Sequence, residues 1–472
     1  MTELHWLSAQ QIAAAYAARS LSPVELVTAL LARISAMDAR LNAFIRLDAE
    51  AALDAAHLAE RALASGCAQS SLCGVPVAVK DIIDVAGQPT TCHSKMMLEH
   101  VAAQDAAVIV RLRAAGAIVL GKLALHEFAI GGPSFDLPFP PARNPWNPAY
   151  HPGGSSSGCG VALAAGFVPL AIGTDTGGSV RNPAGACGVS GLKPTYGAVS
   201  RRGVFPLAFT LDHVGPMARS VGDIALLFDA IAGHDPLDPA SVPGPIRSAG
   251  AELARGVRGL RIGYVRAFHE CDVVADPEVV AALDKVANVL TQEGADVRTV
   301  ALPPLQDFHG AQRVIMAAES WAVHARWLRE RPADYCLSSR RRLMAGAFLS
   351  AGDYIVAQQR RRELVDAVGR AFDGVDVLIV ANAMDPPCRI DDEETMARTY
   401  ARQARNVFSL TGNPALALMC GLSSKGLPLS VQIAGRAHDE AMLLRVGAAY
   451  ERATQWHTRH PPLLSGASGN FA

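Results

Sequence analysis

Near the start of the chain, apolar residues recur at the three- and four-residue spacing of helices that bury one face. This spacing covers residues 8–37, where Pro23 after Ser22 marks the start of a second helix, and it returns over 49–64. Polar residues fill the positions between, as expected for helices packed on a core. The pattern predicts an N-terminal helical layer over about residues 1–70.

Beyond this layer, short apolar runs alternate with helical segments. The predicted strands are 75–79, 117–120, 260–265, 297–301, 377–380 and 427–434, and the predicted helices are 105–115, 158–165, 220–232, 277–293, 308–331, 352–373, 395–409 and 438–453. Such alternation is typical of an α/β fold with a largely parallel sheet. The proline- and glycine-rich segment 234–254 predicts a surface connection. Because the alternation never breaks, we predict a single domain over residues 1–472.

Composition narrows the class of protein without choosing a function. The 472 residues are 50% hydrophobic and carry a net charge of −1, which suits a globular protein with a large core. No basic tail is present, so no nucleic-acid partner is expected, and a homodimer stays open. No secretory signal or membrane-spanning stretch is evident. The nine cysteines lack Cys-x-x-Cys spacing and are odd in number, so we expect reduced thiols in a cytoplasmic protein.

Two glycine-rich segments carry serines that are candidates for chemistry. Residues 152–158 read Pro-Gly-Gly-Ser-Ser-Ser-Gly, and residues 173–183 read Gly-Thr-Asp-Thr-Gly-Gly-Ser-Val-Arg-Asn-Pro. Glycine lets a ligand approach backbone N–H groups closely, so each loop can cradle an anion or a polarised carbonyl. A nucleophile elbow is disfavoured because Pro148 and Pro152 exclude a central strand before the first loop. A phosphate-binding loop lacks its Gly-Lys-Ser/Thr, and linker loops are disfavoured by the apolar chain around both segments.

A serine nucleophile needs a base, and Lys80 is a candidate. The chain has only six lysines against 37 arginines, yet this one directly follows the apolar run 75–79. Burial lowers the pKa of a lysine and so allows it to accept a proton. Taken alone, the position fits an ordinary strand-end lysine better, with its ammonium group reaching water.

Together these segments resemble the amidase signature family of serine amide hydrolases. The matching segments are Gly74-Val75-Pro76-Val77-Ala78-Val79-Lys80-Asp81, Arg143-Asn144-Pro145, 152–158 and 173–183, and the resemblance extends over roughly 21–451. It implies an α/β fold in which helices cover both faces of a large mixed central sheet. It also implies a Ser-cisSer-Lys triad in which Ser179 is the nucleophile, Ser155 the bridging serine after a cis peptide bond, and Lys80 the base.

The resemblance implies further roles around this triad. The expected oxyanion hole consists of backbone N–H groups from one loop, those of Thr176, Gly177, Gly178 and Ser179. The same loop is expected to be braced by Asp175 and Arg181. The acyl channel is expected to be lined by Ala129 and Ile130. No cofactor or metal is implied, and His126-Glu127 lacks the His-Glu-x-x-His spacing of a metal site.

The same segments say less about the substrate than about the catalytic residues. We expect hydrolysis of a small-molecule amide, with two alternatives left open: a carbamate (urethane) or ester hydrolase, and the A subunit of a glutamine-dependent amidotransferase. Malonamidase-like members of the family read a substrate carboxylate with an arginine three positions after the nucleophile. This chain has Asn182 there, so we expect a neutral or hydrophobic acyl group. The phenylalanine-containing segments 128–139 and 205–209 are candidates for an apolar pocket wall or for ordinary core.

Overall fold

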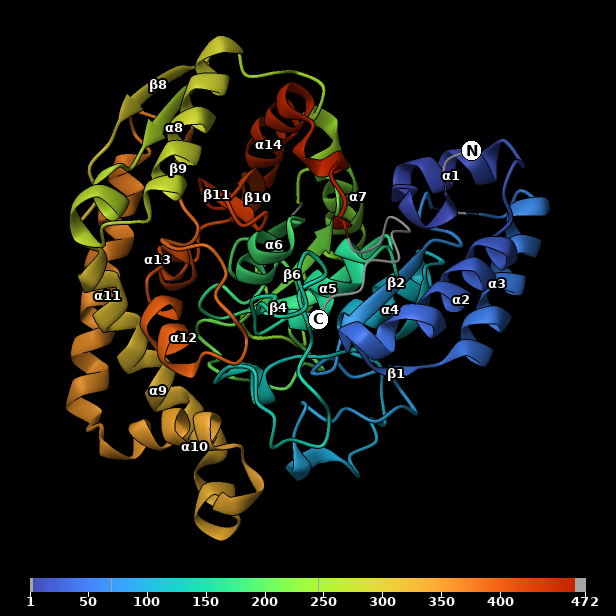
Figure 1. Cartoon of the computed structure of the whole chain (residues 1–472), viewed down its shortest axis with the longest axis horizontal. Coiled ribbons are helices and arrows are strands. Elements are labelled where there is room, and N and C mark those ends of the chain that lie inside the picture. The colour runs from blue at the N-terminus through green and yellow to red at the C-terminus, as the bar shows by residue number, and fades with distance from the viewer. Residues whose placement is uncertain (1–2, 69, 245, 463–472) are drawn as a thin grey trace.

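The computed structural model describes residues 3–68, 70–244 and 246–462. Its strands form one large sheet in the order β1-β3-β2-β4-β6-β5-β10-β11-β9-β7-β8 (Figure 1). The strands are β1 (Phe44–Leu47), β2 (Pro76–Lys80), β3 (Ile118–Leu123), β4 (Leu170–Asp175), β5 (Ser190–Lys193), β6 (His213–Ala218), β7 (Arg261–Tyr264), β8 (Asp296–Thr299), β9 (Val377–Ala381), β10 (Ala415–Leu422) and β11 (Pro428–Gly435).

The sheet is mixed rather than largely parallel. Strand β2 runs parallel to β3 and β4, and β7 runs parallel to β8 and β9. The strands between these two groups pair antiparallel, including β5 with β6 and β10 with β11. The prediction of a largely parallel sheet is wrong in this middle part, because β10 and β11 are joined by a tight turn that only antiparallel neighbours can use. The mixed sheet implied by the family resemblance is confirmed.

Helices cover both faces of the sheet. They are α1 (Ala9–Ala17), α2 (Pro23–Leu41), α3 (Ala49–Ala64), α4 (Ala107–Ala114), α5 (Ser157–Ala164), α6 (Arg181–Cys187), α7 (Val221–Ile231), α8 (Pro277–Gln292), α9 (Leu305–Glu330), α10 (Leu337–Met344), α11 (Ala351–Ala371), α12 (Glu393–Tyr400), α13 (Arg405–Thr411) and α14 (Glu440–Thr454). Gly185 of α6 lies against Ser430, which pairs with Met419. Gly447 of α14 lies against Leu418, the neighbour of Met419. Because successive residues of a strand point to opposite faces, α6 and α14 cover opposite faces.

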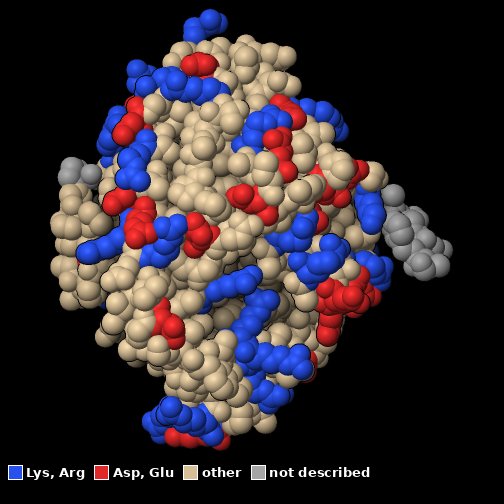
Figure 2. Space-filling view, turned by 90° about the vertical axis from the view of Figure 1, so that its left-hand side faces the viewer, with Lys and Arg blue, Asp and Glu red and all other residues tan. Residues whose placement is uncertain are grey.

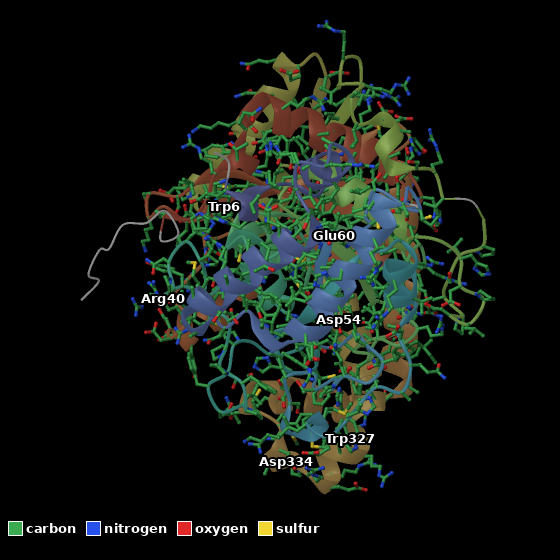
Figure 3. The ribbon with its side chains drawn as sticks, turned by 90° about the vertical axis from the view of Figure 1, so that its right-hand side faces the viewer. Trp6, Arg40, Asp54, Glu60, Trp327 and Asp334 are labelled. Carbon is green, nitrogen blue, oxygen red and sulfur yellow. The ribbon has the colours of Figure 1, made fainter. Side chains whose placement is uncertain are left out.

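The predicted N-terminal helices are confirmed as α1, α2 and α3. Ser8 caps α1 by accepting a hydrogen bond from the backbone N–H of Gln11, and Pro23 occupies the first turn of α2. Figure 3 looks onto this flank, where Arg40 and Asp54 label the solvent-exposed sides of α2 and α3. These helices shield one end of the sheet.

The opposite flank is formed by α9, α10 and α11, with α9 packed against both of the others (Figure 1). Beside it, the predicted helix 395–409 is wrong, because the chain forms two helices, α12 and α13. Between them, Arg402 accepts a hydrogen bond from the Met384 N–H at 3.1 Å, and Gln403 pairs with Ala383. No glycine or proline marks this interruption in the sequence. It sets the direction of α13, which reaches the candidate active site.

The segment 234–254 is less of a free surface connection than predicted. Asp235 and Asp238 are buried and form ion pairs with Arg202 and Arg201, so the first part of the segment packs on the body of the protein. All nine cysteines are free, as expected. Within the described ranges, no helix combines the length and apolar character needed to cross a bilayer.

Candidate active site

The sheet brings Lys80 and the two glycine-rich loops to one edge. Strands β2 and β4 are parallel neighbours, with Val79 paired to Ile172, so their carboxyl ends lie side by side. Lys80 ends β2, and the loop that carries Ser179 follows the end of β4. The other serine loop leads directly into α5, which packs on both strands. The carboxyl ends of parallel strands are a common place for active sites in α/β proteins.

Lys80 is fully buried, and its hydrogen bonds within the described part of the chain go to two hydroxyl groups. Its Nζ lies 2.8 Å from Ser155 Oγ and 2.7 Å from Thr174 Oγ1. Burial lowers the pKa of Lys80 to about 8. The peptide bond between Gly154 and Ser155 is cis, as the resemblance implies. Lys80 is therefore placed to exchange a proton with Ser155 near neutral pH.

A second buried lysine shows how different this environment is. Lys122 on β3 is also fully buried, but its Nζ lies 2.8 Å from the Asp81 carboxylate. The partner of Lys122 is thus a carboxylate, whereas the hydrogen-bond partners of Lys80 are hydroxyl groups. Lys122 was not among the residues that the sequence singled out. The ion pair gives Asp81 a role of its own next to Lys80, because its carboxylate pairs with Lys122 on the neighbouring strand β3.

His126 explains the glycine at position 154. A Cβ on Gly154 would lie 2.0 Å from the His126 ring, so a side chain there would clash. The backbone N–H of His126 donates to the Ser155 carbonyl at 3.0 Å, which fixes the loop that carries Ser155. Burial holds the pKa of His126 well below its ordinary value, so this imidazole is neutral. His126 supports the loop and faces the same cavity as Ser179.

The loop after β4 presents Ser179 to solvent and leaves backbone donors free. Ser179 is partly exposed, and its carbonyl accepts a hydrogen bond from the Ser156 N–H at 3.1 Å, which joins the two serine loops. Among the hydrogen bonds of the described residues, none uses the N–H of Gly177 or Ser179 and none links the Ser155 and Ser179 hydroxyls. Catalytic hydrogen bonds are often loose without substrate. The two free N–H groups suit an oxyanion.

Gly178 differs from the expectation. Its N–H donates to Asp175 Oδ1 at 2.8 Å, so it is not free to bind an oxyanion as predicted. Glycine is required there for two other reasons: its φ is +119°, and a Cβ would lie 2.7 Å from the Arg405 side chain. Gly178 thus lets Arg405 approach the loop closely.

Asp175 and Arg181 form the frame of this loop. Their side chains are fully buried and make two contacts, Nη2 to Oδ1 at 2.8 Å and Nε to Oδ2 at 3.0 Å. Although burial alone would raise it, the pKa of Asp175 is held well below its usual range by the guanidinium group. Asp175 also accepts from the Val180 N–H at 3.1 Å. The geometry is that of the expected brace.

Removing Arg181 should therefore be costly. We expect Arg181→Met to lower the free energy of unfolding by about 3–5 kcal/mol, because it leaves the Asp175 carboxylate buried without its cation. The matched control is Arg326→Met in the exposed Arg326–Glu330 pair, where a loss below about 1 kcal/mol is expected. Urea denaturation of both variants measures the difference. If both variants lost the same small amount of unfolding free energy, Asp175 would be stabilised by something other than the ion pair.

Ser179 opens into a cavity of about 420 Å³, here named the Ser179 cavity. Ala129 and Ile130 are nearly buried and line it, at the positions expected for the acyl channel. The charged residues of this cavity were not predicted from the sequence, and they come from three separate helices: Arg313, Arg342 and Arg405. No spacing rule connects them to the glycine-rich loops.

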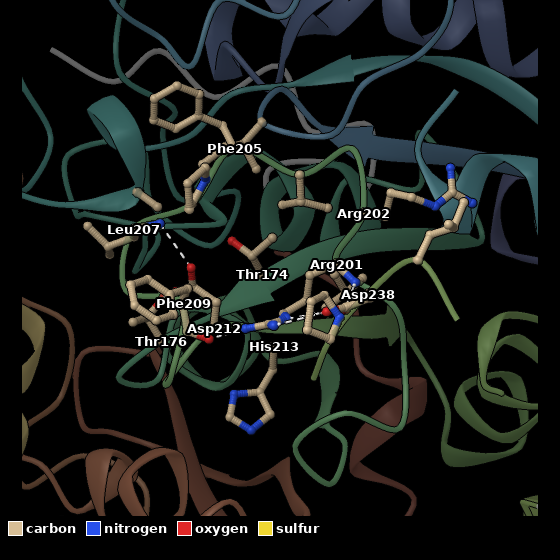
Figure 4. A pocket seen from close by; sticks show the side chains of 17 residues that line it. Thr174, Thr176, Arg201, Arg202, Phe205, Leu207, Phe209, Asp212, His213 and Asp238 are labelled. Carbon is tan, nitrogen blue, oxygen red and sulfur yellow. Dashed lines mark hydrogen bonds and ion pairs between the residues drawn. The ribbon is translucent and has the colours of Figure 1, made fainter. Parts of the chain in front are cut away.

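Figure 4 shows a second cavity of about 210 Å³, here named the Phe205 cavity, which shares Ala129, Thr176 and Leu207 with the Ser179 cavity. Phe205 and Phe209 line it, which agrees with the interpretation of segment 205–209 as an apolar pocket wall. Asp212 connects its wall to the loop that carries Ser179, because its carboxylate accepts from Thr176 Oγ1 at 2.6 Å and from the Leu207 N–H at 2.9 Å. Burial raises the pKa of Asp212 to about 6.

Comparisons with known proteins agree on one family. The family model described as Amidase matches residues 25–444. The A subunit of glutamyl-tRNA(Gln) amidotransferase from Roseiflexus sp. (strain RS-1) is 39% identical over 488 residues, covering 98% of this chain and 99% of the relative. A solved chain from a vestigial protein complex that reveals the origins of an s-triazine catabolic enzyme is 34% identical, with a TM-score of 0.89, covering 95% of this chain and 99% of that chain. A bacterial aryl acylamidase of the amidase signature family is 27% identical, with a TM-score of 0.88, covering 98% and 99%.

One expectation is corrected by these relatives. The absence of a basic tail led us to expect a small-molecule substrate and no nucleic-acid partner. Relatives at this level of identity are named as subunits of an enzyme that acts on glutamyl-tRNA, which contradicts that expectation. A net charge of −1 is an average over the whole surface and carries no information about such partners.

Proposed function

This chain belongs to the amidase signature family of amide hydrolases, and we propose that it cleaves its substrate through an acyl-enzyme on Ser179, with Ser155 and Lys80 moving the proton. The hydroxyl of Ser179 attacks the carbonyl carbon, and its proton passes through the Ser155 hydroxyl to neutral Lys80. The tetrahedral adduct then collapses, the C–N bond breaks, and the amine leaves with the proton that Lys80 returns. Water cleaves the acyl-enzyme by the same route and restores Ser179.

The developing negative charge on the carbonyl oxygen needs donors that are free and fixed. The N–H groups of Gly177 and Ser179 meet this requirement, because the Asp175–Arg181 pair holds their loop and, among the described residues, no acceptor uses them. Fixed donors stabilise the transition state without reorganising during the reaction. We assign the oxyanion hole to these two groups and leave Gly178 out of it. The backbone N–H of Thr176, which was also predicted for this role, has no acceptor among the described residues either and stays a candidate.

One contact supports the role of Lys80 above all. Its buried Nζ lies 2.8 Å from Ser155 Oγ, and its only other hydrogen-bond partner within the described chain is Thr174 Oγ1. A lysine held by hydroxyl groups, with a pKa of about 8, is neutral for an appreciable fraction of the time near pH 7. A general base must have this property.

The comparisons favour a narrower second candidate. Relatives that are 37–40% identical over most of this chain are named as the A subunit of glutamyl-tRNA(Gln) amidotransferase. In that role the same chemistry would release ammonia from glutamine for a partner subunit. Carbamate and ester hydrolysis stay open as variations of the proposed reaction.

A substrate panel separates these candidates. We expect the purified chain alone to hydrolyse members of a panel of primary amides, anilides, carbamates and activated esters, with release of amine or alcohol as the readout and Ser179→Ala as the blank. Turnover that appears only with glutamine, and only when the other amidotransferase subunits have been supplied, would instead establish the amidotransferase role.

A further inference from the structure

The Ser179 cavity is positively charged. Its lining includes the guanidinium groups of Arg313, Arg342 and Arg405, and no Asp or Glu is among the described residues that line it. On the flank that carries α9, α10 and α11, Figure 2 shows a band of Lys and Arg running down the lower half of the surface. Side chains of one sign around a cavity raise the local concentration of ligands of the opposite sign.

Arg405 is the most informative of the three. Its side chain is 4% exposed, and its Nε has no hydrogen-bond partner among the described residues, while one Nη donates to the Asn382 carbonyl at 2.7 Å. Burial lowers the pKa of Arg405 only to about 10, so the guanidinium stays charged at neutral pH. Within the described part of the chain it forms no ion pair, because the nearby Asp175 carboxylate is taken by Arg181. A buried cation without a counter-ion is unfavourable unless a ligand supplies one.

Arg405 also lies directly beside the nucleophile loop. The space where Gly178 would carry a Cβ is 2.7 Å from Arg405 Nε. Gly178 lies next to Ser179 in the chain, so an anion bound by the Arg405 guanidinium would lie close to Ser179. This proximity suits a substrate in which a short chain separates the anion from the reacting carbonyl.

The two other arginines lie at the exposed rim. The Arg342 guanidinium carbon is 5.7 Å from the centre of the Tyr400 ring, and the Tyr400 hydroxyl donates to the Gly154 carbonyl at 3.2 Å. Arg342 is thereby placed near the loop that carries the cis Gly154–Ser155 peptide bond. Arg313 projects from α9 and, like Arg342, has no ion pair among the described residues. Both can attract an anion on its way to Arg405.

We propose that the substrate is a half-amide of a short dicarboxylic acid, whose free carboxylate is bound by Arg405 and attracted by Arg342 and Arg313. This proposal rests on the proposed amide hydrolysis and names its substrate class. It replaces the expectation of a neutral acyl group, which depended on Asn182 alone. Here the recognising arginine follows the nucleophile by more than two hundred positions in the chain.

The same charges select against glutamine. Glutamine has the required carboxylate, but it carries an ammonium group on the adjacent carbon. Among the described residues, no carboxylate lines the cavity to pair with that ammonium, and Arg405 would repel it. Like charges and unpaired polar groups are effective ways to reject a competing ligand. The inference therefore opposes glutamine as the substrate of this chain.

Three amides of similar length test the inference: glutaramate, which has the carboxylate; glutamine, which adds the ammonium; and valeramide, which has neither. We expect kcat/KM for glutaramate to exceed both others by at least about 10-fold, and added salt to narrow its advantage over valeramide. Equal or faster hydrolysis of valeramide or glutamine would overturn the inference. The proposed amide hydrolysis would survive that result.

Variants assign the effect to particular side chains. Arg405→Gln should lower kcat/KM for glutaramate by about 10²-fold with much less effect on valeramide, and Arg342→Gln should act in the same direction but more weakly. Arg405→Lys should restore part of the loss. The control is Arg341→Gln, an exposed arginine next to Arg342 that does not line the cavity. A loss in Arg341→Gln as large as in Arg405→Gln would overturn the assignment.

Binding tests the site without catalysis. In Ser179→Ala, calorimetry should find glutarate bound more tightly than glutamate, valerate or inorganic phosphate, and Arg405→Gln should weaken glutarate binding by about 10²-fold. Tighter binding of any of the other three would overturn the inference. If glutarate binds as expected while no amide is hydrolysed, the anion site stands and the proposed reaction fails.

Discussion

Replacement of Ser179 by alanine is expected to abolish acyl-enzyme formation and to lower kcat by about 10⁶-fold on every substrate. The two serine hydroxyls of the first loop that lie next to the Lys80–Thr174 contacts are already engaged. Ser155 lies against Lys80, and the Ser156 hydroxyl donates to the Thr174 carbonyl at 3.1 Å. Mass spectrometry of acid-quenched single-turnover reactions measures the acyl-enzyme, which should be present in the wild type and absent in the variant.

A neighbouring serine supplies the control for this experiment. The Ser157 hydroxyl makes only a long contact, 3.4 Å, to the Ala124 carbonyl, so Ser157→Ala should keep activity close to that of the wild type. Persistence of the acyl-enzyme in Ser179→Ala, together with its loss in Ser155→Ala, would move the nucleophile to the other loop.

Lys80→Ala is expected to have the second largest effect and to act selectively. An amine leaving group must be protonated as it departs, whereas an activated ester expels a phenolate without help. General acid–base catalysis contributes about 10²–10⁴-fold, so amide hydrolysis should fall by about that factor and ester hydrolysis by less. The measurement is the ratio of amide to ester turnover in the wild type and the variant. An unchanged ratio would exclude Lys80 from proton delivery.

The pH profile provides an independent test of the same residue. Lys80 accepts a proton only in its neutral form, and its pKa is lowered to about 8 by burial. Below pH 8 the neutral fraction grows as pH rises, so wild-type amide hydrolysis should increase with pH and level off above about pH 8. Lys80→Ala should lose this rise. A wild-type profile that is flat from mildly acidic to mildly alkaline pH would contradict the assignment.

Local patterns in the sequence were sufficient for much of the fold and pointed to the segments around the glycine-rich loops, whereas the roles of the residues in them were implied by the family resemblance. Lys80 ends strand β2 and is placed by it, and glycines mark the loops of Ser155 and Ser179. The segment 395–409 was predicted incorrectly because its helical periodicity is continuous. The interruption after Tyr400 comes from hydrogen bonds to residues 383–384, which no local pattern can show.

The charge of the Ser179 cavity could not be predicted for a similar reason. Arg405 begins a helix whose start depends on that interruption, and Arg342 belongs to α10, which was absent from the predicted helices. Gly178 shows the opposite error. The glycine-rich pattern suggested free N–H donors throughout the loop, but the Asp175 side chain accepts from one of them. Which acceptor a backbone N–H group binds depends on the three-dimensional structure, and a local sequence pattern does not show it.

The contacts of Arg181 link the reactive loop to the order in which the chain leaves the ribosome. Besides Asp175, its guanidinium donates to the Arg405 carbonyl at 2.6 Å, to Ser409 Oγ at 2.7 Å and to the side chain of Gln432. A nascent chain that ends before residue 405 therefore contains Lys80, Ser155 and Ser179 but lacks the acceptors that complete the frame of their loop. The frame of the Ser179 loop is therefore complete only once the residues up to Gln432 have been synthesised.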